Sequence, residues 1–243
     1  MDLRPPRIFF IGLCAWAAYI AARSVVLGLL PSGDWASYVE QDLIVSLFRL
    51  GTLLFSLWLG RLAYDREQWW GGKGRPGVAW GLGTALVLAG VVGMLGRQSA
   101  PLEGLWGVRA VEVALNILVA FNEEFGWRGV LLLSLRDWLG EKAALWGTAG
   151  LFTLMHLGYQ PLQALPHVFV VGLALSAARL RGLNLMQLVA IHAGIDIVLA
   201  LYLPSGAESH WGYSTFSSSV ALVAAGLLWF KPPPQAEAKP LPA

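Results

Sequence analysis

The sequence predicts an all-α, polytopic membrane protein with about eight transmembrane helices. Of its 243 residues, 56% are hydrophobic and 13% are charged, whereas roughly 25% of an ordinary soluble domain is charged. Mean hydropathy is +0.60. Apolar runs close to the length of about 20 residues that crosses the hydrocarbon core recur along the chain. Lys and Arg gather in alternate segments between these runs, as cytoplasmic loops require.

The predicted spans follow one another with proline residues near their borders, where a missing backbone donor does least harm. They cover residues 8–30, 42–63, 78–96, 107–135, 143–158, 165–180, 185–203 and 214–230. We expect one transmembrane domain, residues 1–231, and a disordered Pro- and Ala-rich tail, residues 232–243.

The positive charges give the topology. If the N-terminus is cytoplasmic, the outer segments carry Arg97 and Arg109 alone, and both termini lie inside. The inner segments then carry Arg4, Arg7, Arg61, Arg66, Lys73, Arg75, Arg136, Lys142, Arg179, Arg181, Lys231 and Lys239. We expect an integral, multi-pass protein of the plasma (inner) membrane if the source is prokaryotic. A net charge of +2 without a dense basic run indicates no nucleic-acid partner.

Two acids and an arginine stand inside the fourth apolar run. Glu123 and Glu124 are adjacent, and Arg128 follows four residues later. A charged side chain at bilayer depth costs about 3 kcal/mol even on the lenient insertion scale. Three of them in one span are therefore expected to be paired, hydrated or functional. Arg49, in the second run, is expected to snorkel or to pair with an acidic residue such as Asp42.

Two further runs bring titratable side chains to a similar depth. At about 1.5 Å per residue from the predicted cytoplasmic ends, the two glutamates lie roughly 18 to 20 Å deep and His156 roughly 21 Å deep. By the same count His192 and Asp196 lie about 12 and 18 Å deep. This agreement predicts one polar cavity, built from three helices and opening toward the cytoplasm.

Helical geometry divides the acidic pair. Glu124 and Arg128 have the favourable acid-first i, i+4 spacing, so we expect an ion pair. Glu123 points about 100° away, which leaves its carboxylate to accept a proton as a general base. His192 and Asp196 are also spaced i, i+4, so the carboxyl can orient the imidazole. The structural alternative is that these groups only join helices.

Other hydrolytic chemistries have little support. The chain has no Gly-x-Ser-x-Gly element and no His-Glu-x-x-His helix. Its single cysteine, Cys14, lies in an apolar run. We expect no cofactor. Zinc remains open as an alternative, held by Glu123, His156 and His192, because metal ligands need no local spacing.

These residues resemble the motifs of the CPBP family, the CAAX proteases and bacteriocin-processing enzymes also called the ABI family, which includes the type II CAAX prenyl endopeptidases. The resemblance covers roughly residues 108–201, the expected protease core. Three motifs carry it in order: Glu-Glu-x-x-x-Arg at Glu123, Glu124 and Arg128, Phe-x-x-x-His at Phe152 and His156, and His-x-x-x-Asn or Asp at His192 and Asp196.

The resemblance implies an eight-span fold with a cavity in the cytoplasmic half of the membrane. It also implies peptide-bond hydrolysis by water without an acyl-enzyme, by either a glutamate-type or a metal-dependent mechanism. Glu123 would then be the general base. The other implied roles are water positioning and proton transfer by His156, oxyanion stabilisation by His192 and Asp196, and bracing by Glu124 with Arg128.

The last motif position departs from the family if an Asn is its usual oxyanion donor. An ionised carboxylate accepts hydrogen bonds and repels an anion, so Asp196 can donate only when it is protonated. We therefore expect Asp196 to orient His192, with joint metal ligation as the alternative.

The sequence thus predicts an intramembrane endopeptidase in the lipid bilayer. We expect its substrate to be a peptide or protein, and a membrane-anchored or prenylated chain is one class that fits. The first alternative is an immunity or scaffold protein of the same fold that binds without cutting. The second is a proton-coupled transporter that uses Glu123, His156 and His192 as a relay. A free base argues against the first, and the lack of visible inverted repeats argues against the second.

Overall fold

The described part of the chain is helical and contains no strand, which confirms the all-α fold class. The computed structural model describes residues 4–29, 35–94, 106–157, 160, 162–202 and 211–230. The α-helices are α1 (Pro5–Leu29), α2 (Trp35–Ala63), α3 (Arg66–Trp70), α4 (Pro76–Met94), α5 (Trp106–Glu123), α6 (Leu132–Leu139), α7 (Glu141–Leu154), α8 (Leu165–Leu180), α9 (Leu185–Tyr202) and α10 (Trp211–Phe230). A π-helical segment, η1 (Glu124–Leu131), and a 3-10 turn, η2 (Leu162–Ala164), complete the described elements. The predicted tail, residues 232–243, lies outside them.

Three helical ranges of the described chain are long and apolar enough to cross a membrane. They are Pro5–Leu29, Glu40–Ala63 and Leu162–Leu180. Shorter apolar ranges are Pro76–Leu88, Leu185–Val198 and Ser218–Leu228. Eight spans with both termini in the cytoplasm remain a prediction.

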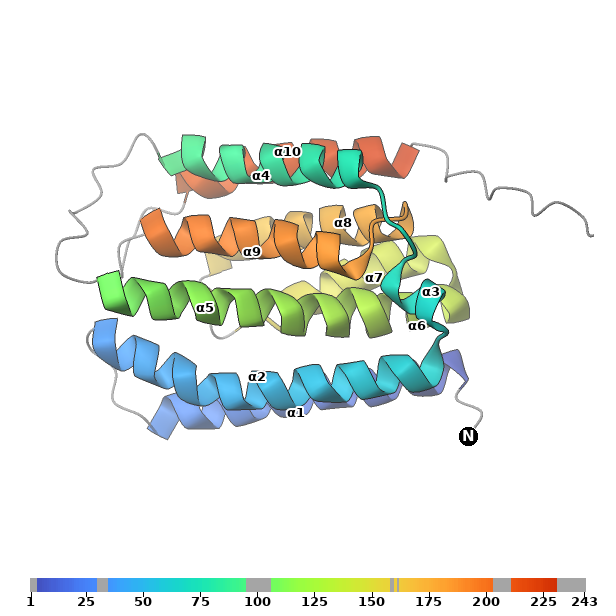
Figure 1. The fold of residues 1–243 in the computed structure, drawn as a ribbon, viewed down its shortest axis with the longest axis horizontal. Helices are drawn as coiled ribbons and strands as arrows, with labels where there is room; N and C mark the ends of the chain where they lie inside the picture. The colour runs from blue at the N-terminus through green and yellow to red at the C-terminus, as the bar shows by residue number, and fades with distance from the viewer. Residues whose placement is uncertain are drawn as a thin grey trace, which may run out of the picture.

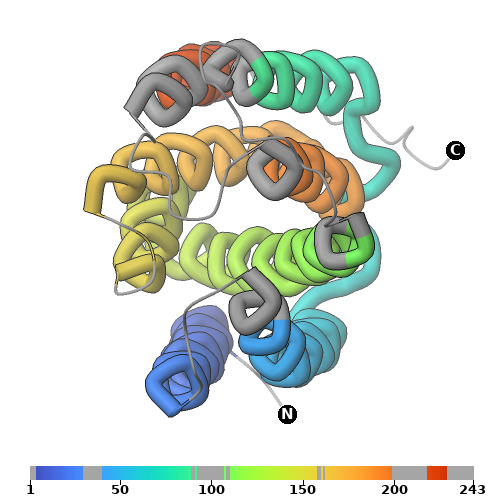
Figure 2. Tube along the Cα trace, turned by 90° about the vertical axis from the view of Figure 1, so that its left-hand side faces the viewer, coloured from blue at the N-terminus to red at the C-terminus, as the bar shows by residue number. Residues whose placement is uncertain are grey.

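The long helices lie side by side in tiers (Figure 1). The pair α1 and α2 forms one outer tier, and α4 and α10 form the tier at the opposite side. Helix α5 packs between α2 and α9, while α8 packs against α7 and α10. The end-on view in Figure 2 shows the same order. The middle tiers therefore bring α5, η1, α8 and α9 together, and these elements carry most of the predicted site.

Two glycines mark the place where the fourth predicted span changes its hydrogen bonding. The run 107–135 is expected to be one helix, but it divides into α5, the π-helical η1 and α6. All eight residues of η1 are buried, and Gly126 and Gly129 lie among them. Glycine weakens an α-helix by about 1 kcal/mol relative to alanine, and π-helical turns concentrate at functional sites. Tertiary packing therefore determines the helical geometry of this segment.

Tryptophan side chains occupy the space that these glycines leave. A Cβ atom on Gly126 would lie 2.3 Å from the Trp16 indole, and one on Gly129 would lie 3.1 Å from the Trp69 indole. Trp69 also packs against Gly60 of α2, where a Cβ atom would come within 2.3 Å of it. The helices α1 and α3 thus press directly against the backbone of η1 and α2.

The short helix α3 lies between two predicted spans and is not predicted from the apolar runs. Its two ends nevertheless carry recognisable capping residues. The Asp65 side chain accepts a hydrogen bond from the Gln68 backbone as the N-cap, and Gly71, with φ of 88°, ends the helix in the left-handed region. Buried Arg179 of α8 donates to the carbonyls of Gln68 and Trp69. Arg179, which the topology prediction counts among the charges of the inner segments, therefore holds α3 against the bundle.

The fifth predicted run, 143–158, ends earlier than expected. Helix α7 stops at Leu154, and His156 lies in the turn that follows it. Pro161 comes soon after and cannot continue a helix, and the residue before a proline is also driven away from helical geometry. The expectation that this helix extends to His156 is therefore wrong, although His156 remains buried.

We expect the substitution Gly126→Ala to destabilise the fold, because its methyl group would overlap the Trp16 ring. Overpacking of this kind costs about 1 to 3 kcal/mol. The measurement is the melting temperature of the purified protein in detergent. The control is Gly150→Ala on α7, whose Cβ atom would meet nothing within 4 Å. Equal melting temperatures for the two variants would contradict the packing described here.

Candidate active site

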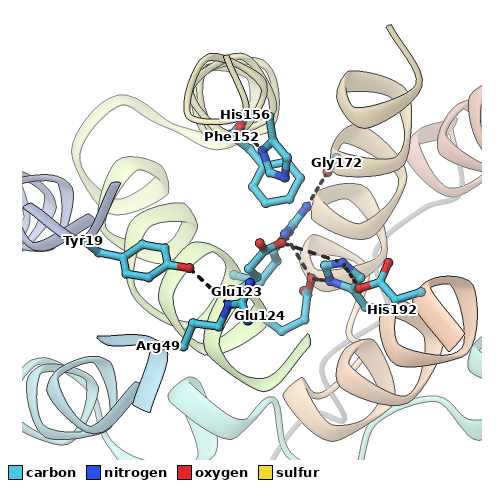
Figure 3. A network of polar contacts seen from close by, with 10 residues as sticks. Tyr19, Arg49, Glu123, Glu124, Phe152, His156, Gly172 and His192 are labelled. Atoms are coloured by element: carbon cyan, nitrogen blue, oxygen red, sulfur yellow. Dashed lines mark hydrogen bonds and ion pairs between the residues drawn. The ribbon is translucent and has the colours of Figure 1, made fainter. Parts of the chain in front are cut away.

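A buried ion pair forms the centre of the site. Arg128 Nη1 donates to Glu124 Oε1 at 3.0 Å, and both side chains are 0% exposed. Arg128 Nη2 also donates to the Gly172 carbonyl of α8 at 3.2 Å (Figure 3). The guanidinium carbon lies 4.6 Å from the centre of the Phe152 ring of α7, a distance at which the ring face attracts a cation. The predicted pair is confirmed, and it joins three elements.

The same glutamate orients His192. The Nδ1 atom of His192 lies 2.7 Å from Glu124 Oε1. An ionised carboxylate can only accept, so Nδ1 carries the proton and donates. The i, i+4 spacing predicts this orienting role for Asp196, but Asp196 Oδ2 lies 3.5 Å from the other ring nitrogen, Nε2. Glu124 therefore makes the shorter contact and fixes the ring.

A second carboxyl group faces the outer side of the imidazole. Glu123 Oε2 lies 3.7 Å from His192 Nε2, so this nitrogen stands between the carboxyl groups of Glu123 and Asp196. Their side chains are 12% and 19% exposed, whereas that of Glu124 is 0% exposed. The adjacent glutamates thus differ in kind: Glu124 is sealed into an ion pair, and Glu123 borders accessible space.

His156 stands one aromatic ring away from the ion pair. Its Nδ1 lies 2.7 Å from the Phe152 carbonyl, and its ring centre lies 4.5 Å from that of Phe152. Because a carbonyl only accepts, Nδ1 is the protonated nitrogen of the neutral ring and Nε2 is an acceptor. His156 interacts electrostatically with His192 and Arg128. The other five predicted site residues, Glu123, Glu124, Arg128, His192 and Asp196, are linked by direct contacts.

Sequence reasoning missed a second polar group beside the glutamates. Arg49 of α2 donates from Nε to the Tyr19 hydroxyl of α1 at 3.2 Å. Its Nη2 lies 2.7 Å from Asp42, which confirms that expected pairing. Arg49 interacts electrostatically with both Glu123 and Asp196. A lone arginine in an apolar run was the available signal, but its tyrosine partner lies on another helix.

The described residues hold no group of three or more His, Cys, Asp or Glu side chains arranged to bind a metal ion. In particular, both ring nitrogens of His192 already face carboxyl groups, and Nδ1 of His156 faces a carbonyl. This arrangement of the described residues assigns no role to zinc, and an experiment with a chelator tests the zinc alternative.

Comparisons with known proteins agree with the motifs. Residues 106–198 match the family model described as type II CAAX prenyl endopeptidase Rce1-like. The chain is also 30% identical over 211 residues to an uncharacterized 24.3 kDa protein of Escherichia coli, covering 76% of this chain and 91% of that one. The chain belongs to the CAAX protease family. No solved structure matches it.

Membership of the CAAX protease family supports a CAAX-protease-like peptidase located in a membrane. The matched range contains all three motifs and the π-helical segment, and it includes α5, α8 and most of α9. Tyr19 and Arg49 lie before it, so the family match does not cover this part of the site.

We expect Arg128→Met to destabilise the protein by about 3 to 5 kcal/mol, because it leaves the buried carboxylate of Glu124 without its cation. The measurement is the free energy of unfolding in mixed micelles. The matched control is Arg136→Met, eight residues further on, whose pair with Asp137 is 28% and 27% exposed. That exposed pair is expected to contribute about 1 kcal/mol or less. Similar losses in both variants would show that Arg128 is not the central cation.

Proposed function

We propose that this protein is an intramembrane endopeptidase in which Glu123 activates a water molecule to hydrolyse a peptide bond. One observation carries the proposal. Glu123 borders accessible space beside His192, whereas the carboxylate next to it in sequence is sealed into an ion pair with Arg128. A partly accessible carboxylate held by a rigid, buried framework has the geometry of a general base.

The reaction balances with water as the only co-reactant. The water oxygen bonds to the substrate carbonyl carbon, its proton passes to Glu123, and the carbonyl electrons move onto oxygen. When the tetrahedral intermediate collapses, the C–N bond breaks and the same proton passes to the amine. His156 helps to align the water by accepting a hydrogen bond at Nε2. This nitrogen is the acceptor because Nδ1 of the same ring donates to the Phe152 carbonyl.

The surrounding roles follow from the contacts. Glu124 and Arg128 hold η1 against α7 and α8, and Glu124 fixes the orientation of His192. Asp196 lies on the exposed side of His192, with Oδ2 3.5 Å from Nε2. The substrate is a peptide or protein segment near the cytoplasmic membrane face, with a prenylated or otherwise membrane-anchored chain as the first class to examine. That choice follows the description of the matching family model.

The membrane placement is also part of the proposal. Eight spans with both termini in the cytoplasm put Glu123 and His192 within the membrane, roughly 18 to 20 Å and about 12 Å from the cytoplasmic ends of their spans. The proposed compartment is the plasma membrane of a prokaryote. The distribution of Lys and Arg supports this topology. We propose catalysis without a cofactor.

The test is cleavage of a peptide library, including prenylated peptides, by the purified protein with and without a chelator. We expect cleavage by the wild type in both conditions and at least about a 10²-fold loss for Glu123→Gln, the lower range for a general base. The control is Glu112→Gln, eleven residues earlier on α5. If the wild type cleaves none of the peptides, the proposal that this protein is a peptidase is refuted. Cleavage lost to the chelator and restored by zinc would establish the metal-dependent alternative.

We expect Asp196→Asn to retain turnover within about tenfold of the wild type, since a neutral hydrogen bond contributes about 1 kcal/mol and tenfold in rate corresponds to about 1.4 kcal/mol. The amide keeps the contact with His192 Nε2 and can also donate to an oxyanion. The measurement is kcat on the best library peptide. A loss as large as that of Glu123→Gln would assign the chemistry to Asp196.

A further inference from the structure

We infer that Tyr19 is a further catalytic residue, whose hydroxyl, held by Arg49, donates a hydrogen bond to the oxyanion of the tetrahedral intermediate. This inference rests on the proposed function and adds a residue from α1, outside the range matched by the family model. It assigns a part in the chemistry to the first two helices.

The position of Tyr19 is fixed by aromatic packing. Its ring meets Trp16 edge-on with centres 5.4 Å apart, and Trp16 packs against Trp127 of η1 at 5.2 Å. Trp16 also fills the space beside Gly126. Because Gly126 and Trp127 lie two and three residues after Glu124, the Tyr19 ring is anchored to the segment that carries the site.

The side chain points into the site. Figure 3 shows Tyr19 reaching from α1 toward the two glutamates, with His192 on their other side. A substrate carbonyl bound over Glu123 can therefore place its oxygen on the side of the phenol.

Arg49 leaves the phenol ready to donate. The hydrogen bond from Arg49 Nε uses an oxygen lone pair of Tyr19, so the hydroxyl proton remains for another acceptor. The guanidinium is itself fixed by Asp42 at 2.7 Å and by Ser46 at 3.1 Å. Hydrogen bonds that form a chain polarise and strengthen one another. A fixed donor aimed at developing charge is the arrangement that lowers a barrier.

The α9 side of the site lacks such a donor. His192 Nδ1 is committed to Glu124, and its Nε2 stands between two carboxyl groups. Asp196 accepts hydrogen bonds when ionised. Tyr19 supplies the neutral donor that an amide at position 196 would supply. It keeps its proton throughout, so the balance of the hydrolysis is unchanged.

The test compares Tyr19→Phe with the wild type on one peptide substrate and on a peptide aldehyde, whose hydrate resembles the tetrahedral intermediate. The phenyl ring preserves the contact with Trp16. We expect kcat to fall on the order of 10²-fold, as for the loss of one oxyanion donor, with an unchanged KM. The aldehyde is expected to lose affinity by a similar factor. Tyr64→Phe, at the residue directly after the end of α2, is the control and should match the wild type.

Two further variants separate a chemical role from a structural one. In an Asp196→Asn background the amide can replace the phenol, so Tyr19→Phe should reduce kcat much less there. Arg49→Lys keeps the charge beside Asp42 but withdraws the planar donor, and should lower kcat several-fold. Melting temperatures of all variants show whether they fold.

The outcomes distinguish this inference from the proposed function. Wild-type kcat and aldehyde affinity in Tyr19→Phe, or a loss confined to KM, would overturn the role of Tyr19 while leaving Glu123 as the base. An equal loss in both backgrounds, with a lowered melting temperature, would assign Tyr19 to packing and overturn the inference. Absence of cleavage by the wild type would overturn both.

Discussion

One oxygen atom, Oε1 of Glu124, accepts hydrogen bonds from both Arg128 and His192 in a fully buried setting. A carboxylate stripped of water is tolerated only when its partners are well placed, and losing one of them leaves an uncompensated charge. Arg128 extends the arrangement to α7 and α8, while His192 extends it to α9. The packing of four elements and the orientation of the candidate catalytic imidazole thus depend on this carboxylate. Because Glu124 makes these structural contacts, the carboxyl group of Glu123 is available for catalysis.

Much of this organisation could be predicted from residue types and spacing. The apolar runs and their prolines located the long helices, and i, i+4 spacing identified the partners Glu124 and Arg128. The contact between Glu124 and His192 could not be found in this way, because 68 residues separate them and a helical pattern says nothing about the facing side of another helix. Depth arithmetic placed the two side chains at a similar level without deciding which would touch. The i, i+4 pair of His192 and Asp196 consequently received an orienting role that Glu124 performs at shorter range.

The remaining differences arise where local sequence and tertiary packing compete. Gly126 and Gly129 remove side chains from η1, and Trp16 and Trp69 from other helices take their space, so the segment adopts π-helical hydrogen bonding. The end of α7 at Leu154 leaves His156 in a turn, where its Nδ1 donates to the Phe152 carbonyl of α7. Tyr19 and Arg49 belong to helices that lie before the range matched by the family model. Their partnership depends on the way α1 and α2 pack, which no single run of residues reveals.

The central claim is that Glu123 acts on a water molecule and forms no bond to the substrate. The most direct measurement is a single turnover in ¹⁸O-labelled water, followed by mass spectrometry of the product and of the enzyme peptide that contains Glu123. We expect ¹⁸O in the new carboxyl group of the product and none in the glutamate side chain. Label in Glu123 with an unlabelled first-turnover product would contradict the claim, because it would show that the carboxylate itself had attacked the substrate.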